Sequence, residues 1–129
     1  MNKLDKESII GISALLVHAA KIDEIYSDHE KDLIKNFIKS YLENGDPNEF
    51  LKKAEEVEKN SNQLLNYTNI IKQNSTDIKK DIIEHLWKVI ISDNTVDQYE
   101  SNLMRRICGL IYFPDKECAE IKLKLIDNK

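Results

Sequence analysis

The chain has 129 residues, of which 41% are hydrophobic and 33% are charged, so it is long enough for one domain with its own core and too short for two. It contains only three Gly and two Pro, too few for an all-β fold with its many tight turns. The net charge of −4 without a block of Lys or Arg argues against nucleic acid or an anionic membrane as a partner.

No stretch approaches the roughly 18 uncharged apolar residues that a membrane span needs. The N-terminal apolar run lacks the pattern of a signal peptide, because Asp5 and Glu7 precede it and no small-residue cleavage site follows it. We therefore expect a soluble cytoplasmic protein that does not insert into a membrane.

The first predicted helix runs from about Asp5 to Ile22 and is apolar nearly all round, which is typical of a buried central helix. A second helix begins after Ser27, because Ser27-x-x-Glu30 has the pattern of a capping box. Asn44 and Gly45 are expected to end it, with Gly45 in the left-handed position that follows a helix.

A third helix starts with Asp46 as N-cap and Pro47 as its first residue. Its narrow apolar stripe consists of Phe50, Leu51, Ala54 and Val57. A fourth helix is predicted over 62–73, and its inward-facing residues are Leu64, Leu65, Tyr67, Ile70 and Ile71.

The fifth predicted helix, from Asp77 to Ile91, has the same apolar character as the first. The sixth begins at Asp97, and Asp97-x-x-Glu100 forms a second capping pattern. After a stop at Pro114 a seventh helix spans 115–126, and its expected core residues are Ala119, Ile121, Leu123 and either Leu125 or Ile126. The pattern predicts a single all-α domain of about seven helices over residues 1–129.

The sequence contains an internal repeat, since residues 16–38 can be laid on residues 86–108 without a gap. In this alignment Asp23 matches Asp93 and Glu30 matches Glu100. Each copy reads as the end of an apolar helix, a short acidic turn and the start of an amphipathic helix. We therefore predict two matched helical hairpins, with the third, fourth and seventh helices packed outside them.

Two interpretations of the acidic turns remain open. Asp23 and Asp93 follow the C-terminal ends of apolar helices, where the helix dipole disfavours a carboxylate. In the first interpretation they accept hydrogen bonds from the next helix, and Glu30 and Glu100 complete capping boxes. In the second interpretation the four carboxylates are ligands of a divalent cation, and such oxygen ligands suit Ca²⁺ or Mg²⁺.

Catalytic patterns are not evident in the sequence. His18, His29 and His85 belong to no Ser/His/Asp or Cys/His arrangement, and there is no Gly-rich phosphate loop. Cys108 and Cys118 form no CxxC and indicate no disulfide framework; Cys108 occupies a core position and is expected to be a buried free thiol. We therefore predict that the protein is not an enzyme.

The two stretches that carry the repeat are LLVHAAKIDEIYSDHEKDLI and LWKVIISDNTVDQYESNLMRRICGLI. They resemble the TerB-like proteins, in which an A-x-x-D-G-x-x-x-x-x-E signature occurs in both halves of an all-helical domain. The resemblance covers the chain from Ser8 to Leu125. Two positions depart from it, since the Gly after Asp is Glu24 in the first copy and Asn94 in the second.

The resemblance implies a role in tellurite resistance and related stress responses, an intracellular location and an acidic surface that binds a divalent metal. Its metal ligands would be Asp23, Glu30, Asp93 and Glu100. The partner implied is another protein, of a membrane-associated stress complex. Two functions follow as hypotheses: a stress-response module that binds a divalent cation through paired acidic turns, and a metal-free helical scaffold that docks a partner protein through an exposed apolar patch on the third, fourth or seventh helix.

Overall fold

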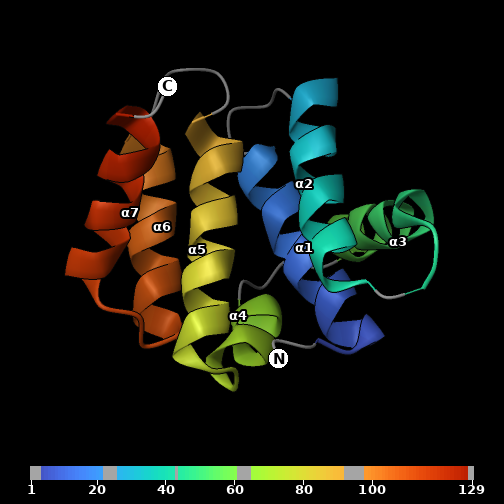
Figure 1. Ribbon diagram of the computed structural model, residues 1–129, viewed down its shortest axis with the longest axis horizontal. Coiled ribbons are helices and arrows are strands. Elements are labelled where there is room, and N and C mark those ends of the chain that lie inside the picture. The colour runs from blue at the N-terminus through green and yellow to red at the C-terminus, as the bar shows by residue number, and fades with distance from the viewer. Residues whose placement is uncertain (1–3, 22–25, 43, 61–64, 92–97, 128–129) are drawn as a thin grey trace.

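The computed structural model describes residues 4–21, 26–42, 44–60, 65–91 and 98–127. Seven α-helices and no strand occur in these ranges (Figure 1). The helices are α1 (Lys6–Ala20), α2 (Asp28–Tyr41), α3 (Pro47–Asn60), α4 (Leu65–Lys72), α5 (Thr76–Ile91), α6 (Gln98–Leu110) and α7 (Asp115–Asp127). The predicted all-α fold is therefore confirmed.

Helix α1 lies at the centre of the first half of the chain. It begins after Asp5, whose Oδ1 accepts a hydrogen bond of 2.7 Å from the Ser8 backbone N–H. Its sequence is apolar on nearly every side, and it packs against α2, α3, α4 and α5. A helix surrounded in this way needs apolar residues all round, and ten of its residues, from Ile9 to Ala20, are buried.

The connection between α2 and α3 differs from the prediction in one detail. Helix α2 ends at Tyr41, and its C-cap residue Leu42 is already extended, so Gly45 is not the residue that directly follows the helix end. Gly45 still has a positive φ of 132°, where a residue with a side chain is disfavoured. The N-terminus of α3 is as predicted: Asp46 Oδ1 accepts from the Asn48 N–H at 3.0 Å, and Pro47 is the first helical residue.

The second half of the chain is arranged around α5. Figure 1 shows α6 and α7 on one side of α5 and the first three helices on the other. Helix α5 packs against α7, α1 and α2, while α6 packs against α4 and α7. The predicted equivalence of the two hairpins stays a prediction, because their turns at 22–25 and 92–97 lie outside the described residues.

The predicted inward face of α7 is confirmed at Ile121 and Leu125 and is wrong at Ala119 and Leu123. Cys118 and Ile121 are buried and Leu125 packs against the core, whereas Ala119, Leu123 and Ile126 are exposed. The buried residues have the i, i+3, i+7 spacing of one helical face. Because α7 contains two alternative apolar stripes, only its position against α5 and α6 decides which of them is covered.

Candidate functional site

One of the four predicted metal ligands is fully described, and it takes part in a capping box. Glu30 is buried, and its Oε1 accepts hydrogen bonds from the Ser27 backbone N–H at 2.8 Å and the Ser27 hydroxyl at 3.0 Å. The Ser27 hydroxyl in turn accepts from the Glu30 N–H at 3.2 Å. The capping role predicted for Glu30 is therefore confirmed.

The other three predicted ligands fall outside what the structure describes. Asp23 and Asp93 belong to the segments 22–25 and 92–97, and Glu100 lies in the first turn of α6 with a side chain that is not described. Among the side chains that are described, no three His, Cys, Asp or Glu residues are grouped so as to hold a metal ion. Convergence of the four carboxylates stays a prediction.

A polar network joins α3 to the residues on either side of the segment 22–25. The Tyr26 hydroxyl donates to Glu55 Oε2 at 2.6 Å. Glu58 Oε1 accepts from Lys21 Nζ at 2.9 Å, and Glu58 Oε2 lies 3.5 Å from His18 Nδ1. The acidic face of α3 therefore holds both the end of α1 and the residues that precede α2.

Acidic and basic side chains both lie around Tyr26. Burial raises the pKa of the Tyr26 hydroxyl, and its hydrogen bond to Glu55 and the negative charges of Glu55, Glu30 and Glu58 raise it further. Lys31 Nζ lies 4.9 Å and Lys21 Nζ 5.8 Å from the centre of the Tyr26 ring, within the range of a cation–π contact.

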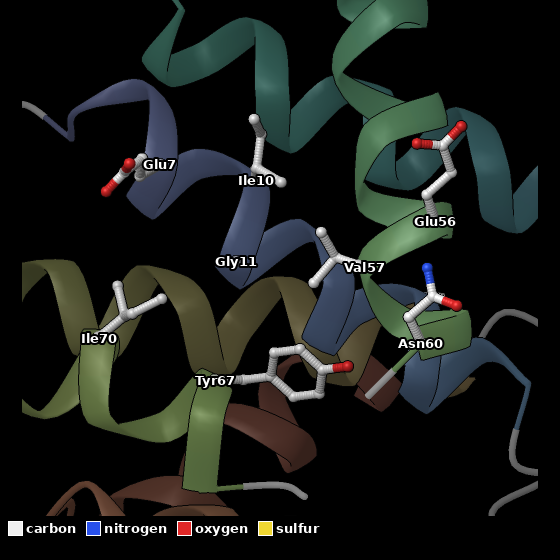
Figure 2. A pocket seen from close by; sticks show the side chains of 8 residues that line it. All are labelled: Glu7, Ile10, Gly11, Glu56, Val57, Asn60, Tyr67 and Ile70. Atoms are coloured by element: carbon white, nitrogen blue, oxygen red, sulfur yellow. The ribbon is translucent and has the colours of Figure 1, made fainter. Parts of the chain in front are cut away.

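A groove with a volume of about 570 Å³ lies between α1, α3 and α4. Figure 2 shows the residues that line it, which are Glu7, Ile10, Gly11, Glu56, Val57, Asn60, Tyr67 and Ile70. The groove is mostly apolar, and its size is within the range of ligand-binding pockets. Val57, predicted to belong to the buried stripe of α3, has 40% of its surface exposed here.

Gly11 allows α1 and α4 to approach each other below the groove. A Cβ atom at position 11 would lie only 2.4 Å from Ile70 Cδ1, so any larger residue would displace the Ile70 side chain. The shape of the groove therefore depends on a residue without a side chain in an otherwise apolar helix.

Tyr67 places a polar atom against this apolar surface. Its side chain is only 4% exposed, and its hydroxyl is buried without a hydrogen-bond partner. In Figure 2 the ring extends from α4 toward Val57 and Asn60 of α3. A buried hydroxyl without a hydrogen-bond partner costs about 1–3 kcal/mol.

The sequence matches the family described as Tellurite resistance protein TerB over residues 10–123. The chain belongs to the TerB family. The match includes α2 to α6 completely and most of α1 and α7. None of the curated proteins and none of the solved structures gave a match.

Sequence reasoning predicted acidic turns, which lie outside the described residues, and it missed the groove. Two signals were present: Gly11 interrupts an apolar helix, and Val57 ends a narrow apolar stripe on a highly charged helix. Neither signal identifies a groove until α1, α3 and α4 are placed together. No helix in the described part of the chain has both the length and the apolar character required to cross a membrane.

Proposed function

We propose that this TerB-family domain is a non-enzymatic stress-response module that docks a segment of a partner protein in the groove between α1, α3 and α4. The observation that carries the proposal is the buried, unpartnered Tyr67 hydroxyl beside an apolar groove. The stress role rests on the family description, tellurite resistance. An apolar patch involving the third and fourth helices is what the docking hypothesis requires.

The lining chemistry supports an amphipathic helix with basic flanking residues as the partner segment. The base of the groove is apolar and includes Ile10, Val57 and Ile70. Leucine-like side chains of a partner can be buried against it. Glu7 and Glu56 place negative charge on the groove wall, and Lys or Arg residues of a partner complement it.

The docking test uses two synthetic amphipathic peptides of equal length, one built from Leu and Lys and one from Leu and Glu. We expect the Leu/Lys peptide to shift the NMR methyl signals of Ile10 and Ile70, and to bind at least tenfold more tightly than the Leu/Glu peptide. Val57→Asp should weaken binding at least tenfold, because the bound peptide would bury a carboxylate in the apolar base of the groove.

Leu123→Asp is the matched control, since Leu123 is an exposed apolar residue on α7. It should leave peptide affinity unchanged. Equal binding of both peptides, or equal losses in the Val57 and Leu123 variants, would show non-specific adhesion and contradict a docking groove.

A second proposal is that the acidic turns bind a divalent cation through Asp23, Glu30, Asp93 and Glu100. The matched spacing of Asp23 and Glu30 in the first copy and of Asp93 and Glu100 in the second supports it. Oxygen ligands favour Ca²⁺ or Mg²⁺. This proposal is independent of the groove, and both sites can exist in one molecule.

The cation test is a titration of the full chain with CaCl₂ or MgCl₂, followed by amide NMR. We expect shifts concentrated in residues 23–30 and 93–100, and their loss in the Asp23→Asn and Asp93→Asn variants. Asp46→Asn is the control, because Asp46 is an exposed N-cap that accepts from Asn48 far from both turns in sequence. Absence of shifts at millimolar ion would rule out the cation site.

A further inference from the structure

The last six residues of α3 are held differently from the rest of that helix. The buried residues of α3 all come before them and are Phe50, Leu51 and Ala54. Over 55–60 no residue is buried, and Val57, the only apolar residue there, has 40% of its surface exposed. Apolar packing therefore fixes the first part of α3 firmly and its last six residues much less.

Polar contacts hold these six residues from one side of the helix. The Tyr26 hydroxyl donates to Glu55 Oε2 at 2.6 Å, and Lys21 Nζ donates to Glu58 Oε1 at 2.9 Å. Lys21 Nζ also lies 5.8 Å from the centre of the Tyr26 ring, so the two contacts belong to one network. Glu55 and Glu58 are three residues apart and share one side of α3. We call the four residues Lys21, Tyr26, Glu55 and Glu58 the α3 anchor.

The groove residues of α3 belong to the same turns but lie on the other side of the helix. They are Glu56, Val57 and Asn60 (Figure 2). An α-helix turns by about 100° per residue, which places these three residues on the side of α3 opposite Glu55 and Glu58. One side of these turns thus forms a wall of the groove, and the other side is tied to the end of α1 and to the residues before α2.

We propose that the α3 anchor positions the α3 wall of the groove, so that docking depends on Lys21 and Tyr26 although neither residue lines the groove. This inference rests on the proposed docking function. When an anchor contact is lost, the last turns of α3 open locally, because little buried apolar surface opposes the opening. The partner then binds only the fraction of molecules whose wall is in place, which lowers the apparent affinity by that fraction.

Amide hydrogen exchange of the free protein, followed by NMR, tests the positioning without a ligand. Tyr26→Phe keeps the ring and removes the hydrogen bond to Glu55. The amides of 58–60 should then exchange about tenfold faster than in wild type, while that of Leu51 keeps its rate. Tyr41→Phe is the matched control, because it removes a hydroxyl that donates to a carboxylate of α5; it should leave exchange at 58–60 unchanged.

An exchange of charges tests the second contact of the α3 anchor. Lys21→Glu places two carboxylates against each other, so exchange at 58–60 should become faster and the Leu/Lys peptide should bind about fivefold more weakly. The double variant Lys21→Glu, Glu58→Lys restores an ion pair at unchanged net charge, and it should recover both values to within about twofold. Lys35→Glu is the charge control, because Lys35 pairs with Asp32 within α2 and should affect neither value.

Three results would overturn the role of the α3 anchor: unchanged exchange at 58–60 in Tyr26→Phe, equal acceleration in Tyr26→Phe and Tyr41→Phe, or a double variant that is no better than Lys21→Glu. Failure of the docking function is a separate result. If neither peptide binds wild type while the exchange rates change as expected, the docking function is wrong and the positioning of the α3 turns by the anchor is still supported.

Discussion

Phe37→Ala is expected to lower the free energy of unfolding by about 3–5 kcal/mol, the usual cost of removing a fully buried aromatic side chain. Phe37 lies on the buried face of α2 and is completely inaccessible to solvent. The centre of its ring is 5.1 Å from that of Tyr41 and 5.2 Å from that of His85. The substitution therefore leaves a cavity where α2 packs against α5.

Urea denaturation followed by circular dichroism at 222 nm (the helix signal) measures this loss. Leu123→Ala is the control, because Leu123 is 58% exposed and its truncation should change stability by less than about 0.5 kcal/mol. A loss below about 1 kcal/mol for Phe37→Ala would contradict the packing of α2 on α5.

The second large effect is a loss of stability at alkaline pH caused by Tyr26 and Tyr41. Burial raises the pKa of both hydroxyls, and their hydrogen bonds to Glu55 and Asp81 raise it further. The pKa of each is therefore higher in the folded state than the value of about 10 in the unfolded chain. Their contribution to stability is complete below pH 10 and is lost as the pH rises above 10 toward the folded-state value.

Above pH 10 each tyrosine should steepen the fall of the unfolding free energy by at most about 1.4 kcal/mol per pH unit. The measurement is urea denaturation between pH 8 and 11. Tyr26→Phe and Tyr41→Phe should each flatten the decline, and the double variant should flatten it most. Tyr112→Phe is the control, since Tyr112 is 71% exposed; an equal flattening in that variant would refute the assignment to the half-buried hydroxyls of Tyr26 and Tyr41.

Local signals in the sequence determined the helices. The capping box of Ser27 and Glu30, and the pair Asp46 and Pro47, act within one turn of the residues that they position. The sequence of α1 is apolar on nearly every side and therefore predicted a central helix, because only the interior of the fold buries such a surface completely. The all-α fold and the family could thus be inferred before any coordinates.

Only the tertiary structure decided which groups separated in sequence meet in space. In the structure one of the two apolar stripes on α7 packs against the rest of the protein, so that Cys118 is buried and Leu123 is exposed. It brought Cys118 to Trp87, and it buried the Tyr67 hydroxyl without a partner. These outcomes depend on packing between helices, which hydrophobic spacing within a single helix does not specify.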